Sequence, residues 1–205
     1  MEEQDKLYEA AKFFKDNLEN KRFHLKAGNK QKKLIEFDIQ FTANNFKHLT
    51  GLHKLTDVPQ FKRKSSRLYN DILNKEITEK DIFQSEKLTD ETIKRIEHFQ
   101  VLKDILQDKR IMIRSVDGQF FKIPADYMIT KSDVDKQYAH LFLKRNDGNQ
   151  SITFPVTFII EPSTLYLGKK EERWTVLSIE EVKKTTLSKK TNPIDGKDEE
   201  HEHER

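Results

Sequence analysis

Apolar residues recur with a helical period at the start of the chain and with a two-residue period further on. In residues 3–19 the apolar side chains fall three and four positions apart, which predicts an amphipathic helix. Residues 34–41, LIEFDIQF, alternate apolar with acidic or amide side chains, a pattern typical of a half-buried strand. Gly28 and a basic cluster lie between these segments. We therefore interpret residues 1–30 as an N-terminal helix followed by a basic linker.

A short helix is expected directly after this strand. Thr42 is a suitable N-cap, Phe46 and Leu49 would form the apolar face, and Gly51 would be the left-handed residue that ends the helix. Helical spacing returns in three further segments, at residues 65–75, 78–84 and 90–107, of which the last is the longest.

The period changes again after residue 109. Asp117-Gly118 predicts a hairpin, NDGN at residues 146–149 predicts a second one, and residues 173–182 predict a final strand. Pro155 indicates a bulge or a sheet edge. We therefore predict an α+β fold in which N-terminal helices pack on a C-terminal antiparallel meander sheet. This α+β domain would span residues 31–186, and residues 187–205 would be a disordered charged tail.

Composition excludes several classes of protein. The chain has no cysteine, which rules out disulfides, a thiolate nucleophile and thiolate zinc sites. Its N-terminus is acidic where a signal peptide would be basic, and no apolar run reaches the roughly 18 residues of a membrane span. We expect a cytoplasmic protein that does not associate with membranes.

Positive charge is concentrated in the first part of the chain. Residues 20–75 carry ten lysines and three arginines against four carboxylates, a net charge of +9, although the whole chain has only +3. Clustered cations favour a polyanionic partner such as nucleic acid. The alternative is a solvated basic surface with no partner.

Candidate chemistry gathers in NNFKHLTGLHK, residues 44–54. His48 could serve as a general acid or base, and Asn44, one turn earlier on the same helix face, could orient its ring. The catalytic candidates are His48, Thr50 and Lys47. The substrate-binding candidates are Asn44, His53, Lys54, Lys62, Arg63, Lys64 and Arg67. The alternative is that His48 is a surface or capping residue and that Gly51 only ends a helix.

Other motifs give no support for further chemistry. The chain lacks GxGxxG, GxxxxGK[ST] and GxSxG, so dinucleotide, P-loop and hydrolase sites are not indicated, and we expect no cofactor and no metal site. HEHER at the C-terminus is not the HExxH arrangement of a zinc protease. We interpret His140, in an alternating strand, as a core or sheet-face histidine.

Several of these segments resemble a known family. FTANNFKHLTGL, YAHLFLKR, SITFPVTFI and ERWTVLSIE are similar to a phage-borne nuclease-like family, the fourth of those grouped with barnase, EndoU, the colicin ribonucleases and RelE. The resemblance runs from about residue 35 to about residue 180. His48, Thr50 and Gly51 fall on its most specific motif, NFKHLTG. No second histidine falls at a motif position.

The resemblance implies a metal-independent endoribonuclease-like domain of phage or mobile-element origin, with N-terminal helices before a four-stranded antiparallel sheet. His48 would then act in phosphoryl transfer to the ribose 2′-hydroxyl, and RNA or another nucleic acid would be the partner. The alternative is a non-catalytic module that binds nucleic acid or a host or phage protein on the same fold; the oligomeric state is left open. A second titratable or cationic group within about 3–6 Å of His48 in a cleft would favour catalysis, and its absence would favour the binding module.

Overall fold

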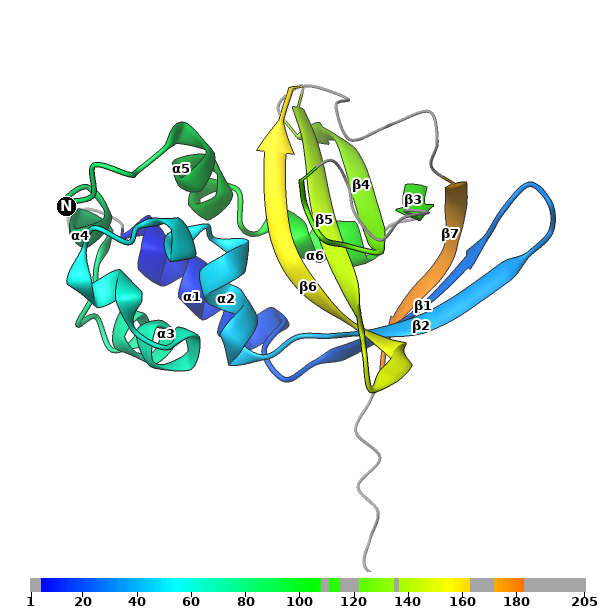
Figure 1. Cartoon of the computed structure of the whole chain (residues 1–205), viewed down its shortest axis with the longest axis horizontal. Coiled ribbons are helices and arrows are strands. Elements are labelled where there is room, and N and C mark those ends of the chain that lie inside the picture. The colour runs from blue at the N-terminus through cyan, green and yellow to red at the C-terminus, as the bar shows by residue number, and fades with distance from the viewer. Residues whose placement is uncertain (1–4, 108–110, 115–121, 135–136, 163–171, 183–205) are drawn as a thin grey trace, which may run out of the picture.

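Most helices lie at one end of the molecule and the strands at the other, and the last helix lies against the strands (Figure 1). The computed structural model describes residues 5–107, 111–114, 122–134, 137–162 and 172–182. Its helices are α1 (Lys6–Asn17), α2 (Ala43–Leu49), α3 (Ser65–Leu73), α4 (Glu79–Ile82), α5 (Asp90–Glu97) and α6 (Val101–Gln107), with short 3-10 turns η1 (Leu52–Lys54) and η2 (Pro59–Lys62). Its strands are β1 (Arg22–Gly28), β2 (Leu34–Gln40), β3 (Ile111–Arg114), β4 (Tyr127–Val134), β5 (Gln137–Asn146), β6 (Asn149–Glu161) and β7 (Glu172–Glu181).

The strands of the described residues form a closed barrel in the order β1-β2-β6-β5-β4-β3-β7. All described pairings are antiparallel except that of β2 with β6, which are parallel and are paired only at Asp38↔Ile152 and Ile39↔Thr153. The Thr153 hydroxyl reinforces this contact by donating to the Asp38 carbonyl at 3.1 Å. The predicted antiparallel meander is therefore wrong, because β1 and β2 from the N-terminal half enter the sheet and β7 pairs with β1 and β3.

Strand β1 explains most of this error. Residues 22–28, placed above in a basic linker, alternate buried Phe23, Leu25 and Ala27 with outward polar or charged side chains. This is the two-residue period of a half-buried strand. The outward residues gave the segment its basic appearance, whereas the inward ones join the core beside β2 and β7.

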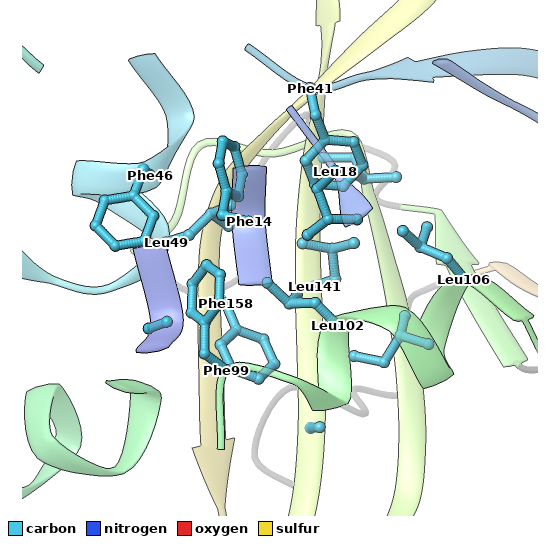
Figure 2. Packing of buried hydrophobic residues seen from close by; sticks show 14 of the residues in the cluster. Phe14, Leu18, Phe41, Phe46, Leu49, Phe99, Leu102, Leu106, Leu141 and Phe158 are labelled. Carbon is cyan, nitrogen blue, oxygen red and sulfur yellow. The ribbon is translucent and has the colours of Figure 1, made fainter. Parts of the chain in front are cut away.

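The segment predicted as one long helix, residues 90–107, is two helices. Helix α5 ends at Glu97 with His98 as its C-cap, and α6 begins at Val101. Helix α6 turns toward the sheet, and Figure 2 shows its residues Leu102 and Leu106 beside Leu141 of β5. The break thus lets α5 stay with the other helices while α6 closes the apolar interior of the barrel.

Other expectations about the second half are confirmed. The hairpin at residues 146–149 joins β5 to β6, and the last strand is β7. A register shift places Phe142 opposite Thr157 but Leu143 opposite Pro155, which is the bulge expected at the proline. The predicted turn at Asp117-Gly118 and the tail from residue 187 lie outside the described residues.

Aromatic side chains tie the helices to the barrel. Phe14 of α1 and Phe46 of α2 have ring centroids 5.6 Å apart, and Phe99 lies 5.4 Å from Phe46 and 6.5 Å from Phe158 of β6. All four rings are fully buried or nearly so, and Figure 2 shows them in one continuous group. Helix α2, which carries NFKHLTG, is therefore packed on β6 rather than lying on a flexible surface.

Candidate functional site

Helix α2 is fixed at its N-terminus by Asn45. The Asn45 side-chain oxygen accepts the backbone N–H of Thr42 at 2.7 Å, as part of a capping box at Thr42, the expected N-cap. Its side-chain nitrogen donates to the Pro155 carbonyl at 3.0 Å. The same amide thus caps the helix and joins it to β6 at the bulge.

At its C-terminus the helix reverses sharply. Gly51 has φ +82°, the left-handed conformation expected from the sequence, and η1 follows at once. Thr50 is fully buried, and its hydroxyl donates to the Phe46 carbonyl at 2.8 Å. Thr50 therefore stabilises the last helical turn, and its hydroxyl does not face solvent.

The reversal brings two histidines together. His48 on the last turn of α2 and His53 on η1 have ring centroids 4.6 Å apart, with an angle of 32° between the ring planes. His48 is exposed, whereas His53 is only partly exposed and its Nδ1 is buried without a hydrogen-bond partner of good geometry. The family motif includes only His48, and the fold places His53 beside it.

The pKa values of both histidines are lowered, which favours the neutral form of each ring. Desolvation, followed by the charge on Lys47, lowers the pKa of His48 although part of its surface meets solvent. Burial, followed by the charge of His48, lowers the pKa of His53 to about 4, and the nearby backbone of Lys47 opposes this fall only in part. A neutral imidazole can accept a proton near pH 7.

A buried arginine lies behind the pair. The Arg95 side chain is 2% exposed, and its guanidinium donates to the Thr157 hydroxyl at 3.1 Å and to the His48 carbonyl at 3.5 Å. It also pairs with Glu91, one turn earlier in α5. Arg95 thereby joins α5, β6 and the end of α2, the three elements around the histidines.

Sequence reasoning did not identify Arg95, because arginine is usually exposed and no motif includes this one. The only signal for it was the i, i+4 pairing of Glu91 with Arg95 on a predicted helix. Glu91 also accepts a hydrogen bond from Lys54 at 2.9 Å. Burial would raise the pKa of Glu91, but the Lys54 hydrogen bond and the Arg95 charge outweigh burial, so this pKa is lowered.

The candidate cations divide into two groups. Lys47 is partly buried, its ammonium donates to the Arg63 carbonyl at 2.8 Å, and burial lowers its pKa. Arg63 pairs with the buried carboxylate of Asp71 at 2.5 Å, so it has a structural partner. The remaining basic candidates are exposed around η2 and α3: Lys62, Lys64 and Arg67. Asn44 is exposed one turn before His48, and among the described contacts no hydrogen bond joins the two.

His140 is confirmed as a core histidine. Its side chain is fully buried, its Nδ1 lies 3.0 Å from the Thr130 hydroxyl, and burial lowers its pKa to about 4.

In the parts of the chain that the structure describes, no cluster of three or more histidine or carboxylate side chains could hold a metal ion. The helices described there are also too short or too polar to cross a membrane.

The chain matches a known protein family. The family described as phage-Barnase-EndoU-ColicinE5/D-RelE like nuclease 4 matches residues 6–195, nearly the whole chain. The match includes both histidines, Arg95 and all the described strands. Neither the curated proteins nor the solved structures gave a match.

Proposed function

The chain belongs to this family of phage nuclease-like proteins, and on that premise we propose that it is an endoribonuclease that cleaves RNA without a metal ion. The reaction is transfer of the phosphoryl group to the adjacent ribose 2′-hydroxyl. The observation that carries the proposal is the His48–His53 pair, two imidazoles with lowered pKa values at the surface of a rigidly packed helix.

In the proposed reaction, His48 is the general base because it is the exposed member of the pair. Its neutral ring takes the proton from the 2′-hydroxyl as the 2′-oxygen forms a bond to phosphorus. The bond from phosphorus to the 5′-oxygen breaks, and this oxygen takes a proton from water. The products are a 2′,3′-cyclic phosphate and a 5′-hydroxyl.

The neighbouring cations have distinct roles in this proposal. Lys47 lies close enough for its charge to lower the pKa of His48, so it can stabilise the negative charge that develops on the phosphorane. His53 packs against the His48 ring and limits its orientations. Thr50 supports the turn through its bond to Phe46. Lys62, Lys64 and Arg67 would contact the RNA backbone beyond the scissile phosphate.

The mixed cation and imidazole surface also fits a module that only binds nucleic acid. The proximity of the two histidines favours catalysis, because binding needs cations but has no use for a second neutral imidazole 4.6 Å from the first.

Mapping of RNA ends tests the reaction class. The purified chain is incubated with total cellular RNA in EDTA, and the new ends are identified chemically. We expect 2′,3′-cyclic phosphates and 5′-hydroxyls, and we expect no cleavage of the same sequences when every ribose is 2′-O-methylated. New 5′-phosphates, or equal cleavage of the methylated RNA, would exclude transfer to the 2′-hydroxyl.

A further inference from the structure

The turn between β1 and β2 has a defined conformation. The Asn29 side-chain oxygen accepts the backbone N–H groups of Gln31 at 3.1 Å and Lys33 at 2.9 Å. The Asn29 backbone pairs with Lys32 and Lys33, and Lys32 adopts a left-handed φ of 62°. Because these bonds fix the backbone, the lysine side chains project from an ordered turn.

Residues 28–34, here called the hairpin tip, carry positive charge alone. Lys30, Lys32 and Lys33 are exposed, no acidic residue occurs in the tip, and none of the three pairs with a carboxylate of the described residues. The stem below differs, since its basic side chains face acids across the two strands. These pairs are Arg22 with Asp38, His24 with Asp38 and Glu36, and Lys26 with Glu36.

The tip is also exposed on its apolar side. Leu34 is 68% exposed and Leu177 of β7 is 49% exposed, and both lie 3.5 Å from the position that a Cβ would take at Gly28. Figure 1 shows the β1–β2 ribbon curving to the end of the molecule opposite the helices. A cationic turn with an adjacent exposed leucine is therefore presented away from the histidine pair.

We propose that the hairpin tip is a second binding surface for RNA, in which the three lysines contact consecutive phosphates of one strand and Leu34 lies against a sugar or base. Three like charges in seven residues repel one another, and a polyanion relieves this repulsion while releasing its own counterions. The charge pairs of the stem make it close to neutral, which confines the attraction to the tip. This surface does not depend on the cleavage reaction proposed above.

Salt titration distinguishes the tip from general positive charge. A 2′-O-methylated single-stranded RNA is the probe, and its binding is measured by fluorescence anisotropy at several salt concentrations. The tip variant is Lys30→Gln, Lys32→Gln, Lys33→Gln. A control variant with the same net charge, Lys12→Gln, Lys80→Gln, Lys103→Gln, changes three exposed lysines of the helices.

Loss of three phosphate contacts should reduce the slope of log affinity against log salt by about 2 for the tip variant, since each contact contributes about 0.7 with single strands. The control should keep the wild-type slope. Equal slopes for all three proteins would overturn the proposal, as would a tip variant that binds RNA normally but no longer binds vesicles of anionic phospholipid. The methylated probe has no free 2′-hydroxyl, so its binding is measured without cleavage, and a chain that cannot cleave RNA still tests the tip.

Discussion

The rings of His48 and His53 lie 4.6 Å apart because one left-handed glycine folds η1 back onto the end of α2. The contact joins residues five positions apart that a continuing helix would place on different faces. Arg95 packs against the same turn. It donates to the His48 carbonyl, and its side chain lies 3.4 Å from the position that a Cβ would take at Gly51. The geometry of the candidate site therefore depends on Gly51 and Arg95 as well as on the two histidines.

Gly51→Ala should destabilise the protein by about 1–3 kcal/mol. A left-handed φ costs any residue with a Cβ roughly this amount, and the added atom would lie 3.1 Å from the Thr92 hydroxyl and 3.4 Å from Arg95. Urea denaturation measures the change. Gly148→Ala is the control, because its Cβ would meet only the Asn146 side chain at 3.6 Å, and we expect a change within about 0.5 kcal/mol. Equal effects of the two substitutions would contradict this account of the turn.

Arg95→Ala should cost about 2–5 kcal/mol, since it empties the space of a side chain that is 2% exposed and leaves the Thr157 hydroxyl and the His48 carbonyl without their donor. Lys6→Ala removes a cation from an exposed pair with Glu97, whose two side chains are 51% and 35% exposed, and should cost at most about 1 kcal/mol. Denaturation of both variants in parallel provides the test. A loss for Arg95→Ala no larger than for Lys6→Ala would show that Arg95 does not hold these elements together.

Protein stability should fall as the pH drops from about 6.5 toward 4. The pKa of His53 is about 4 in the folded protein and about 6.5 in the unfolded chain, so the unfolded chain takes up a proton first and gains relative stability across this window. His53→Gln should reduce this dependence. It should not abolish it, because His140 is shifted in the same direction. An unchanged pH dependence in His53→Gln would contradict the assigned shift.

RNA cleavage should increase with pH, and the midpoint of this increase should lie below pH 6.5. The proposed base must be deprotonated to act, and the pKa of His48 is lowered from its ordinary value of 6.5. Substitution of Lys47 by glutamine should move the midpoint of the profile upward, since the Lys47 charge contributes to this lowering. A midpoint above 6.5 in the wild type would contradict the environment described for His48.

The spacing of residue types along the sequence predicted the elements that are determined by neighbouring residues. Thr42 as a cap, Gly51 as a left-handed terminator, the hairpin at residues 146–149 and strand β7 all follow from side chains near in sequence. The barrel does not, because its closure rests on two parallel residue pairs between β2 and β6, more than 100 positions apart. Apolar spacing that continues across His98 likewise concealed the break between α5 and α6.

The candidate site shows the same division. His48 was identifiable from its motif, but the direction of His53 depended on the turn at Gly51 and could not be deduced from helical spacing. Arg95 became recognisable only when its burial between α5 and β6 was known. Thr50 has the residue type of an anion-binding group, but its hydroxyl is occupied by the Phe46 carbonyl.

The most direct test of the central claim is the rate of RNA cleavage by His48→Ala in EDTA, measured together with its melting temperature. His48 is exposed and no described hydrogen bond involves its ring, so we expect the melting temperature to stay within a few degrees of the wild-type value. We expect the rate to fall by about 100-fold or more, because a positioned general base contributes at least this factor. His24→Gln, at the other end of the molecule, controls for loss of a histidine and should cleave normally. Wild-type cleavage by His48→Ala, or wild-type activity that EDTA abolishes, would contradict the proposed mechanism.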